Sequence, residues 1–393
     1  MKILHTSDWH LGHTLYNYDR TEEQIAMLQQ MVTIVKAEQP DLFLLCGDVY
    51  HTAQPSSSVQ TLFTNALVEI HDANPKMTIV ITAGNHDSGT KHEIFRTPWK
   101  ALKVHTIGQL NKEKIDEHII KVADKGYVVA IPYTNERNIP EGFYQTILDK
   151  VAQENEEGLP VIMTAHTTVK GCDFTGHDYT KLENESWETV GGIDSLQIEE
   201  MGIGYDYLAL GHIHREQFVH TGQHNVRYCG TPIPVSFDEN YPHSVSLVEI
   251  DHQGERPNVR KIEIENPHPL VTLPPEGSAP WNEAINLLKE FPYDISAYIR
   301  LNVMVDEQLP ANAFNEALQV TEGKNCRFCH INTKRQESAN TQEKVLTVQE
   351  FQAEDPMEIV KHYVENQGVP FDEELKELFH ETILALNEDL NNE

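Results

Sequence analysis

The sequence has little cysteine and no long apolar run. Its 393 residues include only five widely spaced cysteines, so a framework of disulfide bonds is not expected. The N-terminus lacks the cationic start, apolar stretch and cleavage site of an export signal, and no segment approaches the ~20 apolar residues that cross a bilayer. We therefore expect a cytoplasmic protein that does not enter a membrane.

Basic residues are also scarce. Lys and Arg number 30 against 61 Asp and Glu, which gives a net charge of −31. This composition argues against proteins that hold nucleic acid by bulk attraction, because those neutralise phosphates with Lys and Arg. The acidic excess is uneven, since residues 351–393 contain twelve acidic residues and only Lys361 and Lys376. A metal cluster or a partner subunit could supply positive charge where a phosphate reacts.

The first half of the chain alternates short apolar runs with amphipathic segments. Residues 21–38 have apolar side chains at helical spacing, and Thr21 with Gln24 has the pattern of a capping box. Continuous apolar runs, which predict buried strands, lie at 42–46, 77–82, 128–131, 161–164 and 207–210. Buried strands separated by helices predict a layered α/β sheet. Further runs with few helices between them predict an antiparallel continuation at 226–229, 245–250 and 259–264.

A group of prolines at 267–275 indicates a domain boundary. After it, alternating helical and strand patterns over 281–333 predict a small α+β unit. Two amphipathic patterns, at 356–364 and 372–390, predict a C-terminal helical pair that packs on its own domain or presents an apolar seam to a partner helix. The chain is thus predicted to divide into parts at 1–270, 275–345 and 350–393.

Side chains that can bind metals follow five predicted strands, a short one that contains Ile3 and Leu4 and those at 42–46, 77–82, 161–164 and 207–210. They are Asp8, His10, Asp48, Asn85, His166, His212 and His214. Helix capping or a structural hydrogen bond would explain any one of them, but unrelated turns would supply Gly, Ser and Pro as readily as seven ligands. Open α/β sheets bind ligands at this edge. Oxygen and imidazole donors without thiolate predict a centre for two ions such as Mn²⁺, Fe²⁺ or Zn²⁺, bridged by one carboxylate.

This set of donors predicts phosphodiester hydrolysis. Two ions about 3.5 to 4 Å apart clamp a phosphodiester and activate a water for in-line attack, so no protein nucleophile is needed. One further group must stabilise or protonate the leaving alkoxide, and histidine suits that role near neutral pH. His86, beside Asn85, is the catalytic candidate.

The ordered motifs resemble those of the calcineurin-like metallophosphoesterases. These motifs are Asp8-Trp9-His10, Gly47-Asp48, Gly84-Asn85-His86-Asp87, His166 and Gly211-His212-Ile213-His214. Three longer segments, at 5–12, 208–214 and 226–239, are similar to the bacterial SbcD nuclease subunits. The resemblance covers the first 270 residues by motif and the remainder by layout.

The resemblance implies a four-layer α/β/β/α metallophosphoesterase sandwich, a capping domain at 275–345, and a helix-loop-helix at 350–393 for a partner ATPase. It implies that Mn²⁺ is the ion and that His86 acts on the leaving group. One ion would be held by Asp8, His10 and His214, the other by Asn85, His166 and His212, with Asp48 as the bridge. The implied activity is 3′–5′ exonuclease action on duplex ends and endonuclease action on hairpins or single strands, in DNA repair, recombination and replication. The implied assembly is a homodimer within a heterotetramer with an SbcC-type coiled-coil ATPase.

Two positions depart from the family pattern. His51 stands where an aspartate usually follows Gly47-Asp48, and Ala165 stands where a glycine commonly precedes His166. Neither position is a ligand, so we expect the dimetal site to survive with altered local hydrogen bonds.

Other motifs have weaker interpretations. The loop after the first motif has side chains of types that commonly contact DNA phosphates, namely His13, Tyr16, Asn17 and Arg20. A solvated loop with Arg20 paired to an acid explains these residues equally well. A basic cluster comprises Lys91, Arg96, Lys100 and Lys103. Its default explanation is a helix face with solvated basic side chains, and contact with DNA is the alternative. Residues 326–330 match a haem-attachment pattern, but the sequence has no export signal or other context for haem. No second cysteine pair completes a zinc site with Cys326 and Cys329, so we predict structural cysteines.

Two rival functions use the same residues. A phosphatase or cyclic-nucleotide phosphodiesterase would act on small molecules, and a catalytically silent protein would keep the fold as a scaffold. The predicted capping domain and helical tail favour DNA over small molecules. The complete ligand set argues against the scaffold.

Overall fold

The computed structural model describes residues 1–173, 189–190, 193–194, 196–219, 224–305, 308–335 and 376. The chain divides into two compact parts, 1–335 and 336–393. The predicted C-terminal helical pair belongs to the second part and, apart from Lys376, which is helical, lies outside the described residues. In the described ranges, no helix combines the length and the apolar character that crossing a bilayer requires.

The first sheet has six strands in the order β16-β15-β1-β4-β5-β6. Four of them run parallel, and β15 and β16 continue the sheet in antiparallel fashion beyond β1, as predicted for 245–250 and 259–264. The strands are β1 Lys2–Thr6, β4 Leu42–Cys46, β5 Thr78–Thr82, β6 Val104–Ile107, β15 Ser244–Glu249 and β16 Asn258–Glu263. The apolar runs predicted as buried strands at 42–46 and 77–82 therefore lie inside this sheet as β4 and β5.

The second sheet has the order β13-β14-β12-β9-β8-β7. Its strands are β7 Ile119–Val122, β8 Gly126–Ala130, β9 Val161–His166, β12 Tyr207–Gly211, β13 Gln217–Phe218 and β14 Val226–Tyr228. The prediction for 226–229 was wrong in direction, because β14 runs parallel to β12. The short strand β13 reverses the chain before β14, so β14 enters the sheet in the direction of β12.

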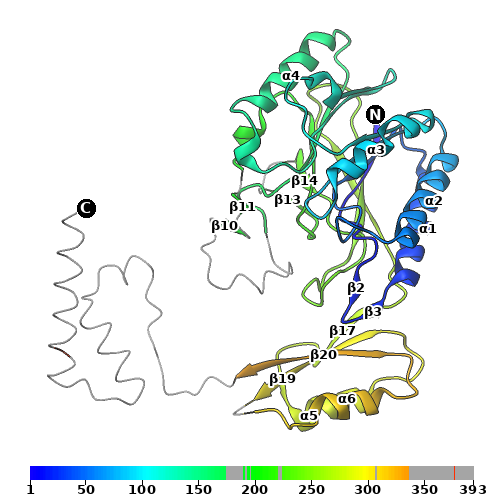
Figure 1. Ribbon diagram of the computed structural model, residues 1–393, viewed down its shortest axis with the longest axis vertical. Helices are drawn as coiled ribbons and strands as arrows, with labels where there is room; N and C mark the ends of the chain where they lie inside the picture. The colour runs from blue at the N-terminus through cyan, green and yellow to red at the C-terminus, as the bar shows by residue number, and fades with distance from the viewer. Residues whose placement is uncertain are drawn as a thin grey trace. The chain divides into compact units, whose positions relative to one another are not determined.

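Helices cover the outer faces of both sheets, which confirms the predicted four-layer arrangement (Figure 1). An apolar cluster that includes Ile3, Leu44 and Ile162 fills the space between the sheets. The helices are α1 Thr21–Glu38, α2 Ser57–Ala73, α3 Gly89–Trp99 and α4 Phe143–Glu154. Helices α1 and α2 pack on the first sheet and α4 packs on the second. Strands with apolar residues on both faces can thus be buried on both sides.

Helix α1 begins without the predicted capping box. No side chain caps it, and the Asp19 carboxylate accepts a hydrogen bond from the Thr21 N–H at 2.6 Å. Gln24 instead supports the loop after β1, since its side chain accepts from the Gly12 N–H at 3.0 Å and donates to the His13 carbonyl at 3.3 Å. The prediction was wrong because tertiary structure brings these loop groups within reach of Gln24.

Residues 270–335 form a separate four-stranded sheet with two helices, which we call the C-terminal sheet (Figure 1). Its elements are β17 Leu270–Leu273, β18 Ala279–Pro280, α5 Trp281–Glu290, β19 Tyr298–Val305, α6 Ala313–Thr321 and β20 Arg327–Arg335. Every pair in it is parallel, so the two helices act as crossover connections. Cys326 and Cys329 are buried and form no disulfide, and their structural role stays a prediction.

Two small hairpins complete the described fold. The hairpin β2 Thr14–Leu15 and β3 Tyr18–Asp19 follows the first motif. The other pairs β10 Thr189–Val190 with β11 Ile193–Asp194. The predicted division of the chain into domains at 270, 275 and 345 stays a prediction.

Candidate metal centre

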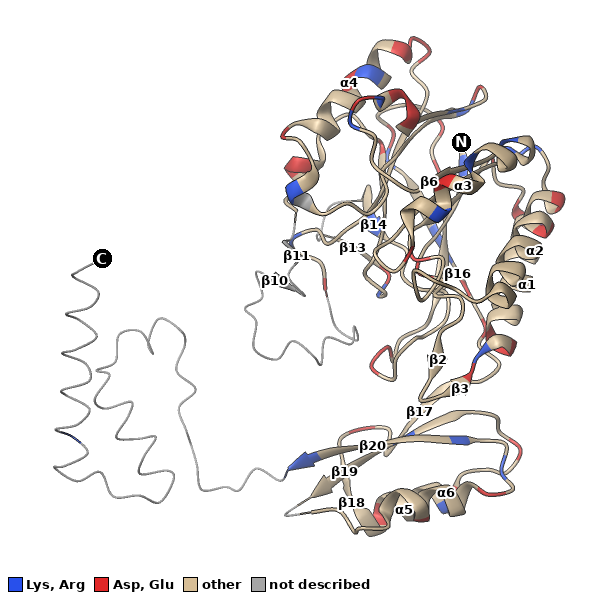
Figure 2. Ribbon diagram, in the orientation of Figure 1, with Lys and Arg blue, Asp and Glu red and all other residues tan. Residues whose placement is uncertain are grey.

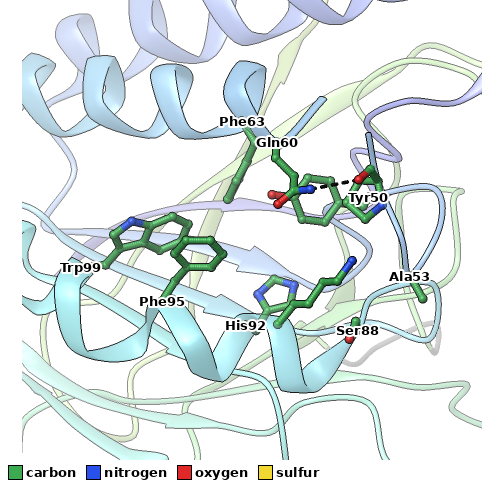
Figure 3. Close-up of a pocket in the computed structure, with 10 residues that line it drawn as sticks. Tyr50, Ala53, Gln60, Phe63, Ser88, His92, Phe95 and Trp99 are labelled. Atoms are coloured by element: carbon green, nitrogen blue, oxygen red, sulfur yellow. Dashed lines mark hydrogen bonds between the residues drawn. The ribbon is translucent and has the colours of Figure 1, made fainter. Parts of the chain in front are cut away.

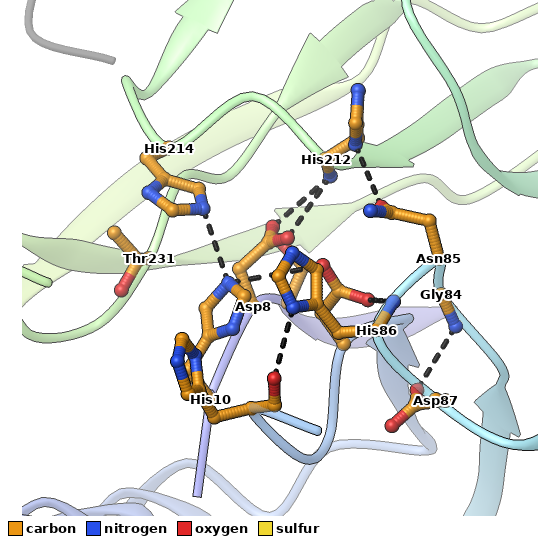
Figure 4. Close-up of polar contacts among 12 residues, drawn as sticks. Asp8, His10, Gly84, Asn85, His86, Asp87, His212, His214 and Thr231 are labelled. Carbon is orange, nitrogen blue, oxygen red and sulfur yellow. Dashed lines mark hydrogen bonds and ion pairs between the residues drawn. The ribbon is translucent and has the colours of Figure 1, made fainter. Parts of the chain in front are cut away.

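All seven predicted ligands lie at one edge of the sandwich, where the carboxyl ends of strands from both sheets meet. We call these residues together with His86 the metal rim. His10 and His214 turn their Nε2 atoms toward each other at 3.2 Å, and with Asp8 they form a group whose ligating atoms lie within 4.8 Å. Figure 4 shows these side chains from different loops pointing toward one another.

A second group forms beside the first around the amide oxygen of Asn85. His166 Nε2 and His212 Nδ1 each lie 3.0 Å from this oxygen. Asp48 lies between the two groups, because its Oδ2 is 3.7 Å from His10 Nε2 and 3.4 Å from His166 Nε2. A carboxylate in this position can be shared by two cations.

The backbone of the rim is unusual for residues with side chains. Asp8, His10, Asp48 and His212 all have positive φ, at 53°, 44°, 48° and 95°. Such conformations cost of order 1–3 kcal/mol each and cluster at functional sites. Hydrogen bonds at 3.0 Å from Asp8 N to the Gly47 carbonyl and from His10 N to the Asp48 carbonyl hold the first two loops together.

Glycines let the loops approach closely. A Cβ on Gly47 would lie 2.1 Å from His166 Nδ1, and one on Gly84 would lie 2.1 Å from Asp48 Oδ1. Only glycine therefore fits at these two motif positions.

Asp87 fastens the second and third loops to each other. Its carboxylate accepts hydrogen bonds from the backbone N–H groups of Gly84 at 2.9 Å, Val49 at 3.1 Å and Tyr50 at 3.0 Å. The third motif contains Asp87, but the sequence indicated no role for it, because Val49 and Tyr50 lie about one strand and helix away along the chain.

Burial and neighbouring charge set the protonation of the rim. Although burial acts to raise the pKa of Asp48, His166 holds it well below its usual range. Burial lowers the pKa of His166, but Asp48 outweighs this and raises it to about 9. Burial lowers the pKa of His212 to about 3 and that of His10 well below its ordinary value. The ionised Asp48 carboxylate and the neutral imidazoles of His10 and His212 are donors that fit divalent cations, whereas His166 releases a proton when it binds one.

Comparison with known proteins gives two family matches. Residues 1–216 match the Calcineurin-like phosphoesterase family, and residues 266–368 match the Type 5 capsule protein repressor C-terminal domain. The first match covers more than half of the chain. The chain belongs to the calcineurin-like phosphoesterases.

Three curated relatives are each named as the SbcD subunit of the nuclease SbcCD. The protein of Rhodobacter capsulatus is 32% identical over 316 residues, which cover 73% of this chain and 75% of the relative. The protein of Bacillus subtilis is 28% identical over 406 residues and 99% of both chains. The protein of Escherichia coli K12 is 29% identical over 300 residues and 70% of both chains. The similarity to the Bacillus subtilis protein therefore extends beyond the residues that match the phosphoesterase family.

Hydrogen bonds behind the metal rim fix the orientation of two of its histidines. His166 donates from Nδ1 to the Cys46 carbonyl at 2.8 Å, and His214 Nδ1 contacts the Glu239 carboxylate at 2.8 Å. Each contact leaves Nε2 facing the cluster, as metal-binding histidines require. Sequence reasoning missed Glu239 as a site residue. The segment 226–239 had indicated it only by resemblance.

His86 lies against the phosphoesterase ligands. Its N–H donates to Asp48 Oδ1 at 2.8 Å, and its Nδ1 lies 2.9 Å from the His51 carbonyl. The ring packs edge-on to His10 with centroids 4.9 Å apart and stacks on His51 at 5.6 Å. His51, which replaces the usual acid, thus supports His86 through its backbone and its ring.

The predicted DNA-contact loop divides into exposed and buried residues. Tyr16 and Asn17 are exposed at the tip of the β2–β3 hairpin, and His13 is partly buried with its ring packed on His51 at 4.7 Å. Arg20 is only 2% exposed.

Arg20 was therefore wrongly included among the DNA contacts. It pairs with Glu23 at 3.4 Å, donates to the Pro234 carbonyl and lies over the ring of Tyr298. The alternative was a solvated loop with Arg20 paired to an acid; the pairing is found, but Arg20 is buried instead of solvated. In the basic cluster, Arg96 likewise pairs with Glu117 at 2.9 Å.

A narrow aromatic pocket lies beside the third loop (Figure 3). Its apolar walls come largely from Phe63, Phe95 and Trp99, and its rim includes Ser88 and Lys91. None of the seven predicted ligands lines it. The pocket is therefore distinct from the metal rim.

Proposed function

We propose that this chain is the metal-dependent DNA nuclease subunit of an SbcC-SbcD-type complex. Its activity is 3′–5′ exonuclease action on duplex ends and endonuclease action on hairpins or single strands. The observation that carries the proposal is the Asp48 carboxylate, which lies between one group containing His10 and another containing His166. The names and coverage of the curated relatives support the DNA substrate and the partner ATPase.

The rim residues fit two divalent ions, for which we propose Mn²⁺. The two groups would be held by Asp8, His10 and His214, by Asn85, His166 and His212, and by Asp48 between them. When bound, such ions clamp the scissile phosphate and activate water. The chain itself orients two of the donors, because the Cys46 carbonyl holds the ring of His166 and the Glu239 carboxylate holds the ring of His214.

His86 is the proposed catalytic residue for the leaving group. Because its Nδ1 lies 2.9 Å from the His51 carbonyl, that nitrogen holds a proton and Nε2 is left for the substrate. As the imidazolium, His86 would carry a second proton on Nε2, and transfer of that proton to the departing oxygen as the P–O bond breaks would leave the neutral ring with its proton on Nδ1. Its backbone contact to Asp48 places this group beside the shared carboxylate.

The remaining parts of the function are also proposals. Lys and Arg are scattered over the described ribbon, so DNA would be gripped locally rather than by a uniformly basic face (Figure 2). His13, Tyr16 and Asn17 are the proposed DNA contacts, without Arg20. We further propose a cytoplasmic homodimer within a heterotetramer, with 275–345 as the capping domain and 350–393 binding the coiled-coil ATPase.

Parallel assays of DNA and a small ester test this function. Purified full-length protein with Mn²⁺ is given a labelled hairpin DNA, a labelled duplex end and a nitrophenyl phosphodiester. We expect cleavage of both DNA substrates that stops on chelation of the metal. Robust turnover of the nitrophenyl ester with intact DNA would instead favour the small-molecule phosphodiesterase.

A further inference from the structure

The strongest unassigned group near the rim is the carboxylate of Glu239. Its side chain is fully buried, and Oε1 accepts a hydrogen bond from His214 Nδ1 at 2.8 Å. Its other oxygen accepts from the Val235 N–H at 3.3 Å. A buried carboxylate on the far nitrogen of an imidazole fixes the ring and increases its basicity as a metal ligand.

The residues just before Glu239 contact the C-terminal sheet. Asp238 Oδ1 accepts from the Arg300 guanidinium at 2.7 Å, and Arg300 also donates to the Phe237 carbonyl at 3.3 Å. Arg300 lies in β19, and its guanidinium covers the Phe237 ring at 5.2 Å. Adjacent residues of one segment therefore reach the C-terminal sheet on one side and a metal-rim histidine on the other.

The β2–β3 hairpin makes a parallel connection from His10. This hairpin begins four residues after His10, and Leu15 joins Phe237, Tyr298 and Cys329 in one apolar cluster. The Tyr18 hydroxyl donates to the Phe328 carbonyl at 3.0 Å. The C-terminal sheet thus contacts the segments next to both histidines of the first group.

The second group has different support. His166 Nδ1 is held by the Cys46 carbonyl at 2.8 Å, and the His212 N–H contacts the Asp8 carboxylate at 3.1 Å. Both of these partners belong to the sandwich. The support of the two groups is therefore asymmetric with respect to the C-terminal sheet.

We propose that Glu239 is a positioning residue for His214, and that the C-terminal sheet, through Arg300, Asp238 and Phe237, helps to set the affinity of the first metal group. This inference rests on the proposed dimetal site. It assigns the C-terminal sheet a part in metal retention, in addition to any contact with DNA. Movement of that sheet would be felt first at the Asp8, His10 and His214 group.

Metal titration tests the proposal without relying on catalysis. Mn²⁺ is titrated into metal-free full-length protein, and bound and free ion are followed by electron paramagnetic resonance, which also distinguishes paired from isolated Mn²⁺. For Glu239→Gln we expect one site to weaken about 10-fold or more, with the other site unchanged, as for other carboxylates behind metal-bound histidine. The paired-ion signal should give way to an isolated-ion signal at limiting Mn²⁺ and return at excess.

Two further variants separate positioning from general damage. Arg300→Ala should weaken the same site less strongly, whereas Arg96→Ala, which breaks the comparable Arg96–Glu117 pair, should leave both sites unchanged. In a His214→Ala background, Glu239→Gln should have no further effect on Mn²⁺ affinity. Thermal melting of each metal-free variant reports on folding.

The outcomes are distinguishable. If wild-type protein binds fewer than two Mn²⁺, the proposed function itself fails. If wild type binds two ions and Glu239→Gln weakens neither or both equally, the positioning role is overturned. If Glu239→Gln weakens one site but Arg300→Ala leaves the titration unchanged, the link to the C-terminal sheet is overturned.

Discussion

The metal rim and the C-terminal sheet bury their side chains in opposite ways. The rim encloses ionisable residues, with Asp8, Asp48 and His166 each at most 2% exposed, and Asp8 and Asp48 lie on loops with left-handed backbone. The C-terminal sheet encloses apolar residues such as Leu288, Leu301 and Phe328. Burying charge without a partner is costly, whereas burying apolar surface stabilises. The rim is therefore built for a ligand, and the stability of the fold comes from elsewhere.

We expect the largest effect from Asp48→Asn, which removes a buried carboxylate from the metal rim. Losing the shared carboxylate removes several kcal/mol of transition-state stabilisation, so we expect DNA cleavage with Mn²⁺ to fall by about 10³-fold or more. In the wild type, Mn²⁺ at 100 times its Kd should add about 2.7 kcal/mol of stability per site, and this gain should largely disappear in the variant. Nuclease assays and melting curves with and without Mn²⁺ measure both. Equal cleavage by the variant would refute the shared carboxylate.

His86→Gln should separate catalysis from metal binding within the rim. Loss of a general acid typically costs about 10²–10⁴-fold in rate, so we expect a decrease of that size in DNA cleavage. Because His86 is not among the proposed ligands, metal content measured by mass spectrometry should stay the same. Unchanged cleavage would remove His86 from the mechanism, and a loss of metal would make it a ligand instead.

The contrast also explains what could be predicted from the sequence. The ligands follow apolar strands, and a strand end is a local pattern, so Asp8, Asp48 and His166 could be placed at one edge from the residues alone. Arg20 and Glu239 could not be interpreted in this way. Arg20 meets the Pro234 carbonyl 214 residues away, and no pattern around Arg20 itself indicates that this contact buries it. Polar residues that support a site depend on such long-range packing.

Arg20→Ala tests the contact between the sandwich and the C-terminal sheet, where the Arg20 guanidinium lies over the Tyr298 ring. Removing a buried guanidinium leaves the Glu23 carboxylate without its ion-pair partner, and breaking such a pair typically costs about 3–5 kcal/mol. Urea denaturation should show this loss in the free energy of unfolding. Tyr16→Ala, at the exposed hairpin tip, serves as the control. It loses the stacking of Tyr16 on His330 but leaves no buried charge unpaired, so we expect a smaller loss of stability together with weaker DNA binding. A stable Arg20→Ala protein with weakened DNA binding would restore Arg20 as a DNA contact.

The smallest expected effect is a pH dependence that arises behind the rim, at His5 on β1. Its ring contacts the Tyr207 hydroxyl at 3.0 Å and the Leu210 carbonyl at 3.2 Å, and burial, aided by the charge of Arg227, lowers its pKa to about 3. The folded protein keeps His5 neutral, whereas the unfolded chain takes up a proton below its ordinary pKa of about 6.5.

The contribution of His5 to stability is therefore complete above pH 6.5 and is lost as the pH falls toward 3. At pH 5 the loss is about 2 kcal/mol, because each pH unit in this window is worth about 1.4 kcal/mol for one proton. His5→Gln should remove that part of the slope when urea denaturation is compared between pH 7 and pH 5. Both proteins share all their other histidines, so the difference between the two slopes isolates His5. Parallel slopes would mean that His5 is protonated at little cost inside the fold, and the region behind the rim would then tolerate charge as the rim itself does.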